Sequence, residues 1–167
     1  MIEEKKTIII APFAARLRSG SKNPKNYPFW KEVVSNLKKH NFHIIQIGSI
    51  GEETIGADET KFGLTFYDLK KLVQECHLWI SIDSFLGHLG ALINKKGIVI
   101  WGVSDPELFG YESNINLIKD RKYLRPNQFD IWDTYPYKDE VFVHPDVVLD
   151  AVLSYSDNEA EFNGNLS

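Results

Sequence analysis

Residues 78–88, LWISIDSFLGH, combine two kinds of local structure within eleven positions. The run 78–82 is short and apolar apart from Ser81, which is typical of a strand buried in a parallel sheet. Asp83 and Ser84 are both favoured as helix N-caps, so the pattern predicts a helix over 85–93. The stretch therefore predicts a buried strand that passes directly into a helix.

That junction also predicts where an anion binds. The first-turn amides of a helix lack partners within the helix and lie at the positive end of its dipole. They point toward the end of the preceding strand, so the amides of Phe85 and Leu86, with the Ser84 hydroxyl, can hold phosphate oxygens. Two alternatives remain open: Asp83 or Ser84 could simply cap the helix, and His88 could bond to a neighbouring loop instead of touching a ligand.

Strands and helices alternate on both sides of this stretch. Further strands are predicted at 7–11, 42–47 and 98–101, a short edge strand at 141–143, and helices starting at Pro28, Thr65 and Pro145. The segments between them, 13–27, 49–63 and 109–137, are predicted to be irregular. This alternation predicts an α/β, Rossmann-like parallel sheet with helices on both faces, and ligands bind such sheets at the carboxyl ends of the strands.

Composition predicts one domain over residues 1–153, followed by a disordered polar tail over 154–167. Apolar residues make up 43% of the 167-residue chain, enough for a core without disulfides. The single cysteine, Cys76, excludes a disulfide framework, and the five histidines lack ligand spacing, so neither a metal nor a cofactor is expected. The N-terminus lacks the apolar stretch of a signal peptide, and no run could span a bilayer, so a cytoplasmic location is expected.

Charge is unevenly distributed along the chain. The net charge is −4, yet the segment from Lys5 to Lys31 holds seven Lys or Arg residues and no Asp or Glu. A local basic loop on an acidic protein favours a small anionic ligand over nucleic acid, although the loop could also be merely solvated. Lys25 could meet a diphosphate as a point charge, and Arg16 and Arg18 could add bidentate contacts.

The remaining loops offer further ligand groups. Glu52 and Glu53 follow the glycine that ends the second strand, and either could accept hydrogen bonds from ribose hydroxyls; both could also be plain surface carboxylates. The aromatic-rich segment 111–137 could offer ring faces to a base or sugar, or pack on itself. The chain has neither a Walker phosphate loop nor a GxGxxG motif.

In order along the chain, five blocks match a known pattern. They are KNYP at 25–28, GSIGEE at 48–53, LTFYDL at 64–69, DSFLGH at 83–88 and WGVSDP at 101–106. Over roughly residues 7–153 the chain resembles the C-terminal, nucleotide-sugar-binding half of GT-B glycosyltransferases of the heptosyltransferase family, glycosyltransferase family 9. Phe85 stands where that family usually has glycine.

The resemblance implies that the chain is a single GT-B-type half that binds a nucleotide-diphosphate sugar. Lys25 would contact the diphosphate, Ser84 with the Phe85 and Leu86 amides would bind its oxygens, and Asp83 and His88 would shape the site. Glu52 or Glu53 would hold the ribose.

To catalyse transfer, this half would need a general base and an acceptor site that it does not obviously contain. The acceptor-binding half carries the carboxylate usually proposed as general base, and only Asp105 and Glu107 are local candidates here. The resemblance favours a glycosyltransferase donor half that works with a separate acceptor-binding protein or as a homodimer. A stand-alone nucleotide-binding module and a compact single-domain enzyme are the alternatives.

Overall fold

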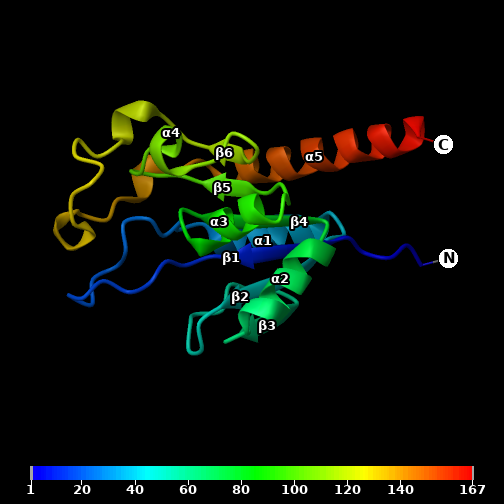
Figure 1. Ribbon diagram of the computed structural model, residues 1–167, viewed down its shortest axis with the longest axis horizontal. Helices are drawn as coiled ribbons and strands as arrows, with labels where there is room; N and C mark the ends of the chain where they lie inside the picture. The colour runs from blue at the N-terminus through cyan, green and yellow to red at the C-terminus, as the bar shows by residue number, and fades with distance from the viewer. Residues whose placement is uncertain (1, 167) are drawn as a thin grey trace.

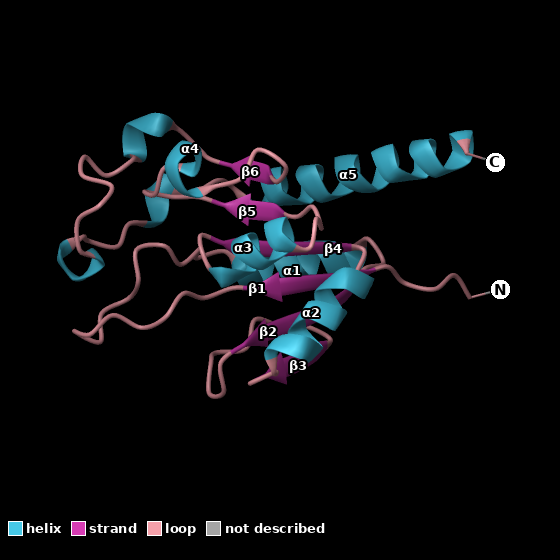
Figure 2. Cartoon of the chain, viewed as in Figure 1, coloured by secondary structure: helices cyan, strands magenta, loops and turns pink. Residues whose placement is uncertain are grey.

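The computed structural model describes residues 2–166, and their strands form one sheet in the order β3-β2-β1-β4-β5-β6. All neighbouring strands are parallel. The strands are β1 (Thr7–Ala11), β2 (His43–Gly48), β3 (Glu59–Phe62), β4 (Leu78–Ile82), β5 (Ile98–Ile100) and β6 (Ile115–Leu117). The predicted Rossmann-like α/β fold is confirmed (Figure 2).

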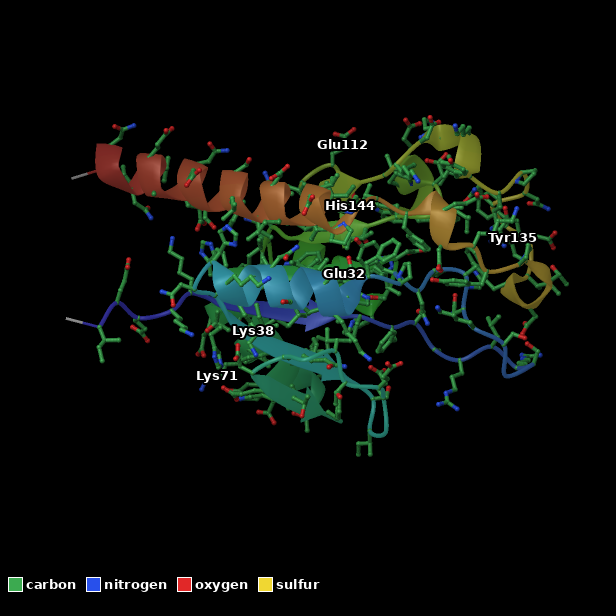
Figure 3. The ribbon with its side chains drawn as sticks, turned by 180° about the vertical axis from the view of Figure 1, so that it is seen from behind. Glu32, Lys38, Lys71, Glu112, Tyr135 and His144 are labelled. Atoms are coloured by element: carbon green, nitrogen blue, oxygen red, sulfur yellow. The ribbon has the colours of Figure 1, made fainter. Side chains whose placement is uncertain are left out.

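Helices cover both faces of the sheet. They are α1 (Trp30–Lys39), α2 (Phe66–Glu75), α3 (Phe85–Leu92), α4 (Pro106–Phe109) and α5 (Pro145–Asn165), with 3₁₀ turns at Arg121–Tyr123, Trp132–Thr134 and Asp139–Val141. Side chains alternate along β1, so Ile8 and Ile10 pack in one core with α1 and α5, whereas Ile9 packs in a second core with α2 and α3. Figure 1 shows α2 and α3 in front of the sheet, and Figure 3, from behind, shows α1 and α5.

The strand order reverses between β1 and β4. From β1 the chain moves outward through β2 to β3, then returns through α2 to pair Leu78 with Ile8 on the other side of β1. Ligands bind open α/β sheets at such a reversal, outside the carboxyl ends of the strands. The long segments 12–29 and 118–144 lie at this edge, away from both termini (Figure 1). The fold therefore brings the basic loop and the start of α3 to one place.

Three elements lie in or beside segments predicted to be irregular. β3 lies within 49–63, β6 within 109–137, and α4 just before β6. β3 and β6 are short, incompletely buried edge strands, so they lack the apolar run that marks β1 and β4. α1 also begins at Trp30, because Pro28 lies in a turn rather than at the first helical position.

The predicted edge strand at 141–143 is wrong. Val141 ends a 3₁₀ turn, and Val141, Phe142 and Val143 are all buried. Phe142 packs edge-on against Tyr27, with ring centroids 5.7 Å apart, and lies against Gly102. All three side chains belong to the core shared with α1 and α5, whereas a strand with one exposed face would alternate.

The predicted disordered tail is also corrected, because α5 continues to Asn165. His77, beside β4, holds the second half of this helix through Ser156 Oγ at 2.8 Å and Glu159 Oε2 at 3.2 Å. The Tyr155 hydroxyl donates to Glu159 Oε1 at 2.6 Å, and the Tyr155 ring packs on the core. The contacts of His77 join residues far apart in sequence, so the polar composition of the segment did not reveal them.

Candidate functional site

At the junction between β4 and α3, no described side chain caps the first turn of α3. β4 ends at Ile82 and α3 begins at Phe85, as predicted within one residue at either end. Ser84 occupies the N-cap position with extended backbone, yet its side chain makes no capping hydrogen bond. The hydroxyl and the first-turn amides are therefore available to an anion, which the simple capping alternative does not provide.

Lys25 reaches this junction from the loop after β1. Its Nζ lies 2.9 Å from Asp83 Oδ2, and both side chains are largely buried. The buried Asn23 holds the loop in place, because its Oδ1 accepts from the Lys25 amide at 3.0 Å and its Nδ2 donates to the Ala15 carbonyl at 2.9 Å. The loop is thus an ordered support that presents one ammonium group to the start of α3.

The two glutamates after β2 have different surroundings. Glu52 Oε1 accepts from the Ser49 amide at 3.0 Å, and the carboxylate lies over Gly48, where any β-carbon would collide with it. Its other oxygen is buried without a hydrogen-bond partner among the described residues. Glu53 is exposed and pairs with Lys31 at 3.3 Å. Of the two ribose candidates, only Glu52 therefore faces the site.

Glu52 lines one of two cavities that meet at the start of α3. This cavity, of about 310 Å³, lies between the end of β2 and α3, and Ser84, Phe85 and Leu86 also line it. The Phe85 ring is half-exposed and stands edge-on to Phe66, with centroids 6.2 Å apart. Phe85, which stands where the family usually has glycine, thus adds an aromatic side chain to the lining of the cavity.

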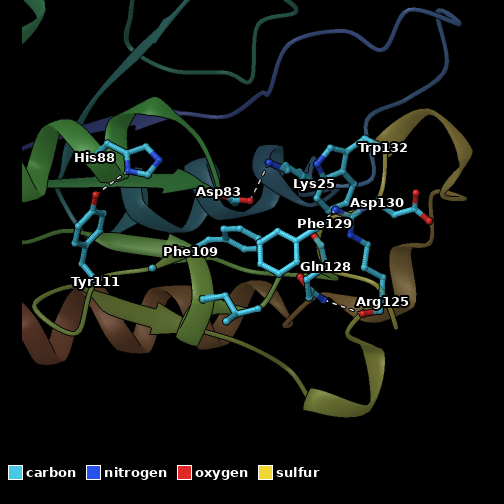
Figure 4. Close-up of a pocket in the computed structure, with 12 residues that line it drawn as sticks. Lys25, Asp83, His88, Phe109, Tyr111, Arg125, Gln128, Phe129, Asp130 and Trp132 are labelled. Carbon is cyan, nitrogen blue, oxygen red and sulfur yellow. Dashed lines mark hydrogen bonds and ion pairs between the residues drawn. The ribbon is translucent and has the colours of Figure 1, made fainter.

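The second cavity has Asp83 in its lining (Figure 4). Its volume is about 530 Å³, and Lys25, Asp83 and His88 are among the residues that line it. The end of α4 and the segment that follows it contribute aromatic, amide and charged groups to the lining: Phe109, Tyr111, Arg125, Gln128, Phe129, Asp130 and Trp132. The structure thus brings the aromatic-rich segment to the predicted site, where its ring faces line a cavity.

His88 is bonded to a neighbouring loop, as one of its two predicted roles requires, and it also lines the cavity. Its Nδ1 is 2.8 Å from the Tyr111 hydroxyl, and the two rings meet edge-on. The imidazole is therefore bonded to a neighbouring loop and still lines the cavity (Figure 4).

Arg16 and Arg18 are exposed and line neither cavity. The guanidinium at the site belongs to Arg125, a residue that the sequence did not single out. Arg125 is 4% exposed, stacks on Trp132 with its Cζ 3.5 Å from the ring centroid, and donates from Nη2 to the Gln128 carbonyl at 2.7 Å. Burial lowers the pKa of Arg125 from its ordinary value. In the sequence, only the many aromatic residues of 111–137 indicated that this segment could line the site.

Asp105 and Glu107, the candidate bases, lie outside both cavities. Asp105 forms a bidentate pair with Arg121, at 3.1 and 2.8 Å, and accepts from the Glu107 amide at 3.0 Å at the start of α4. The hydrogen bonds from Arg121 hold the pKa of Asp105 below its usual range. A carboxylate so engaged is a poor proton acceptor, and its geometry indicates a support for the 103–128 loop.

Asp105→Asn is expected to lower the free energy of unfolding by about 1 kcal/mol at neutral pH, because a charge-assisted pair and part of a helix cap are lost. The pKa of Asp105 is depressed in the folded state. Its contribution is therefore complete above the unfolded pKa of about 3.9 and disappears as pH falls through the folded value. Urea unfolding at pH 7, 4 and 2.5 should show the difference between wild type and variant shrinking toward acid. A difference that is constant with pH, or as large in the exposed control Glu107→Gln, would contradict this assignment.

No group of three or more His, Cys, Asp or Glu side chains in residues 2–166 is arranged to hold a metal ion. No helix in that range is long and apolar enough to cross a membrane. Cys76 is a free, buried thiol whose pKa burial raises to about 11.

The fold and the two cavities at the β1/β4 reversal define a Rossmann-like domain of the kind found in GT-B heptosyltransferases. The model of glycosyltransferase family 9 (heptosyltransferase) matches residues 2–129. The chain therefore belongs to glycosyltransferase family 9. No curated protein matches its sequence.

Solved structures support the same fold. E. coli ADP-heptose lps heptosyltransferase II superposes with a TM-score of 0.68 at 18% identity, over 96% of this chain and 49% of that protein. E. coli heptosyltransferase WaaC with ADP gives 0.57 at 18% identity, over 67% and 37%. The iron-containing dodecameric glycosyltransferase TibC from enterotoxigenic E. coli gives 0.60 at 15% identity, over 87% and 38%. The chain thus spans less than half the length of each.

Proposed function

We propose that this domain binds the nucleotide-diphosphate sugar donor of a glycosyltransferase. The observation that carries the proposal is the convergence of Lys25 on the uncapped first turn of α3, at the point where the strand order reverses. An ammonium group, free amides and a free hydroxyl at one helix start are the groups that a diphosphate requires.

The ribose and the sugar of the ligand would occupy different cavities. We assign the ribose to the Glu52 cavity, where the buried and unpartnered Oε2 can accept from a hydroxyl. The diphosphate would lie on Ser84 and the amides of Phe85 and Leu86, and the sugar would extend past Asp83 into the cavity that His88 lines. A relative solved with ADP, and TibC solved with ADP-D-β-D-heptose, support this class of ligand.

We further propose that transfer to an acceptor uses groups from a partner protein or a second copy of this chain. Asp105 and Glu107, the local carboxylates considered as bases, are both paired with Arg121 and lie outside the cavities. A base must lie within hydrogen-bond reach of the acceptor hydroxyl, and water must be excluded from the closed site. A partner would supply both.

Thermal denaturation with ADP-, UDP-, GDP- and CMP-sugars tests donor binding. One of them at 100 times its Kd should raise Tm by about 5 °C or more, because ligand that binds only the folded state stabilises it by roughly 2.7 kcal/mol. Ser84→Ala should reduce the shift, whereas Ser154→Ala, an exposed serine on α5, should not. The proposal fails if no nucleotide changes Tm at millimolar concentration. The placement fails if Ser84→Ala and wild type respond equally.

A further inference from the structure

Arg125 has more hydrogen-bonding capacity than its surroundings use. Its side chain is almost fully buried, and among residues 2–166 only Nη2 has a partner, the Gln128 carbonyl at 2.7 Å. Nε and Nη1 are buried without a partner in that range. Buried donors in folded proteins are nearly always paired, because an unpaired one costs about 1–3 kcal/mol. Two such donors on one guanidinium, in the wall of a cavity, indicate that a ligand completes them.

The charge of Arg125 is also uncompensated at contact distance. Lys25, the other cation of this cavity, is neutralised by Asp83 at 2.9 Å. Arg125 forms no such ion pair with any described carboxylate, and Asp130 and Asp83 act on it only from farther away. An isolated buried charge is strongly unfavourable, so an anion beside Arg125 would stabilise the site.

Trp132 fixes where that anion would lie. The Arg125 Cζ is 3.5 Å and the Lys25 Nζ 4.8 Å from the centre of the Trp132 ring. Stacking holds the guanidinium plane in a defined orientation, and the shared ring keeps the two cations within the span of one diphosphate-containing ligand. In Figure 4 Lys25 and Arg125 both lie near Trp132 in the lining of the cavity.

We propose that Arg125, held by Trp132, is a second anion-binding subsite, which takes an oxyanion of the ligand that lies beyond the phosphate attached to the nucleoside. This inference rests on the proposed function and adds a specificity residue to it. The oxyanion is either the distal phosphate of the nucleoside diphosphate or an acidic group on the sugar. Both present two oxygens that a guanidinium can bind through paired N–H groups.

Calorimetric titration can separate the two sources. The nucleoside diphosphate of whichever sugar gives the largest thermal shift is titrated into wild type and Arg125→Gln, as is the corresponding monophosphate. If Arg125 holds the distal phosphate, Arg125→Gln weakens diphosphate binding about 10- to 100-fold and leaves monophosphate binding unchanged. If it holds an acidic sugar group, both nucleotides bind the variant normally. The same nucleotide's glucuronate then loses affinity in the variant, whereas its glucose derivative does not.

Two further variants keep the result interpretable. Arg125→Lys retains the charge but not the paired donors, so it should keep the fold and lose part of the affinity even if Arg125→Gln unfolds. Arg121→Gln removes an arginine of the same loop that lies outside the cavity and should not alter the diphosphate-to-monophosphate ratio. Equal binding of every ligand by wild type, Arg125→Gln and Arg125→Lys would overturn the subsite alone. Failure of wild type to bind any nucleotide would instead overturn the proposed function.

Discussion

Lys25→Ala is expected to weaken binding of a nucleoside diphosphate about 100-fold, equivalent to roughly 2.7 kcal/mol. The substitution removes the ammonium group that would meet the diphosphate. It also removes the cation that lies 2.9 Å from the Asp83 carboxylate, so the unpaired carboxylate would repel the ligand. Calorimetric titration of the nucleotide that stabilises wild type measures the loss.

The double variant Lys25→Ala/Asp83→Asn separates the two causes. Removing the repelling carboxylate should recover about tenfold of the lost affinity, because a buried charge without its partner accounts for much of such losses. Lys31→Ala is the matched control, since Lys31 is exposed and pairs only with exposed Glu53 among the described residues. If Lys31→Ala weakens binding as much as Lys25→Ala, the effect is one of net charge and the assignment of Lys25 is wrong.

Trp79→Ala is expected to lower the free energy of unfolding by about 3–5 kcal/mol, the largest stability effect predicted here. Trp79 is fully buried in β4, and its Nε1 donates to the Lys95 carbonyl at 2.9 Å. Its ring lies so close to Gly90 and Gly97 that neither could carry a β-carbon without displacing it. The end of α3 and the turn that leads to β5 therefore pack directly against the Trp79 indole. Because these two glycines have no side chains, they cannot fill the space that the indole would leave.

Urea unfolding of Trp79→Ala beside Tyr67→Ala tests the argument. Tyr67 is an aromatic residue of α2 that is 73% exposed, so its loss should change the free energy of unfolding by less than about 0.5 kcal/mol. A loss below about 1 kcal/mol for Trp79→Ala would contradict it, because core truncations of this size cost several times more.

The central part of the fold could be predicted because its signals are local. The central residues of β1 and all of β4 are buried on both faces, so each strand is mostly apolar in the sequence. β3 and β6 could not be predicted, because pairing with β2 and β5 determines them more than their own residues do. The continuation of α5 depends on His77, a residue some 80 positions earlier.

The candidate site likewise contains residues that the sequence predicts and residues that it does not. Lys25, Glu52 and Ser84 follow strand ends or precede helix starts, so parallel-sheet topology alone predicts that they converge. Arg125 and Trp132 lie in a segment with little regular structure, and no periodicity places such a segment against the sheet. The role proposed for them rests on the burial of Arg125, on its stacking against Trp132 and on the donors that Arg125 leaves unpaired.

The central claim is that a nucleotide diphosphate lies at the start of α3, and a crystal structure of the complex tests it most directly. In crystals grown with the stabilising nucleoside diphosphate, we expect the phosphate oxygens within hydrogen-bond distance of Ser84 Oγ and the amides of Phe85 and Leu86. Lys25 Nζ should contact the same group. Nucleotide bound elsewhere, for example in the cavity between α1 and residues 54–56, with the first turn of α3 untouched, would contradict the account.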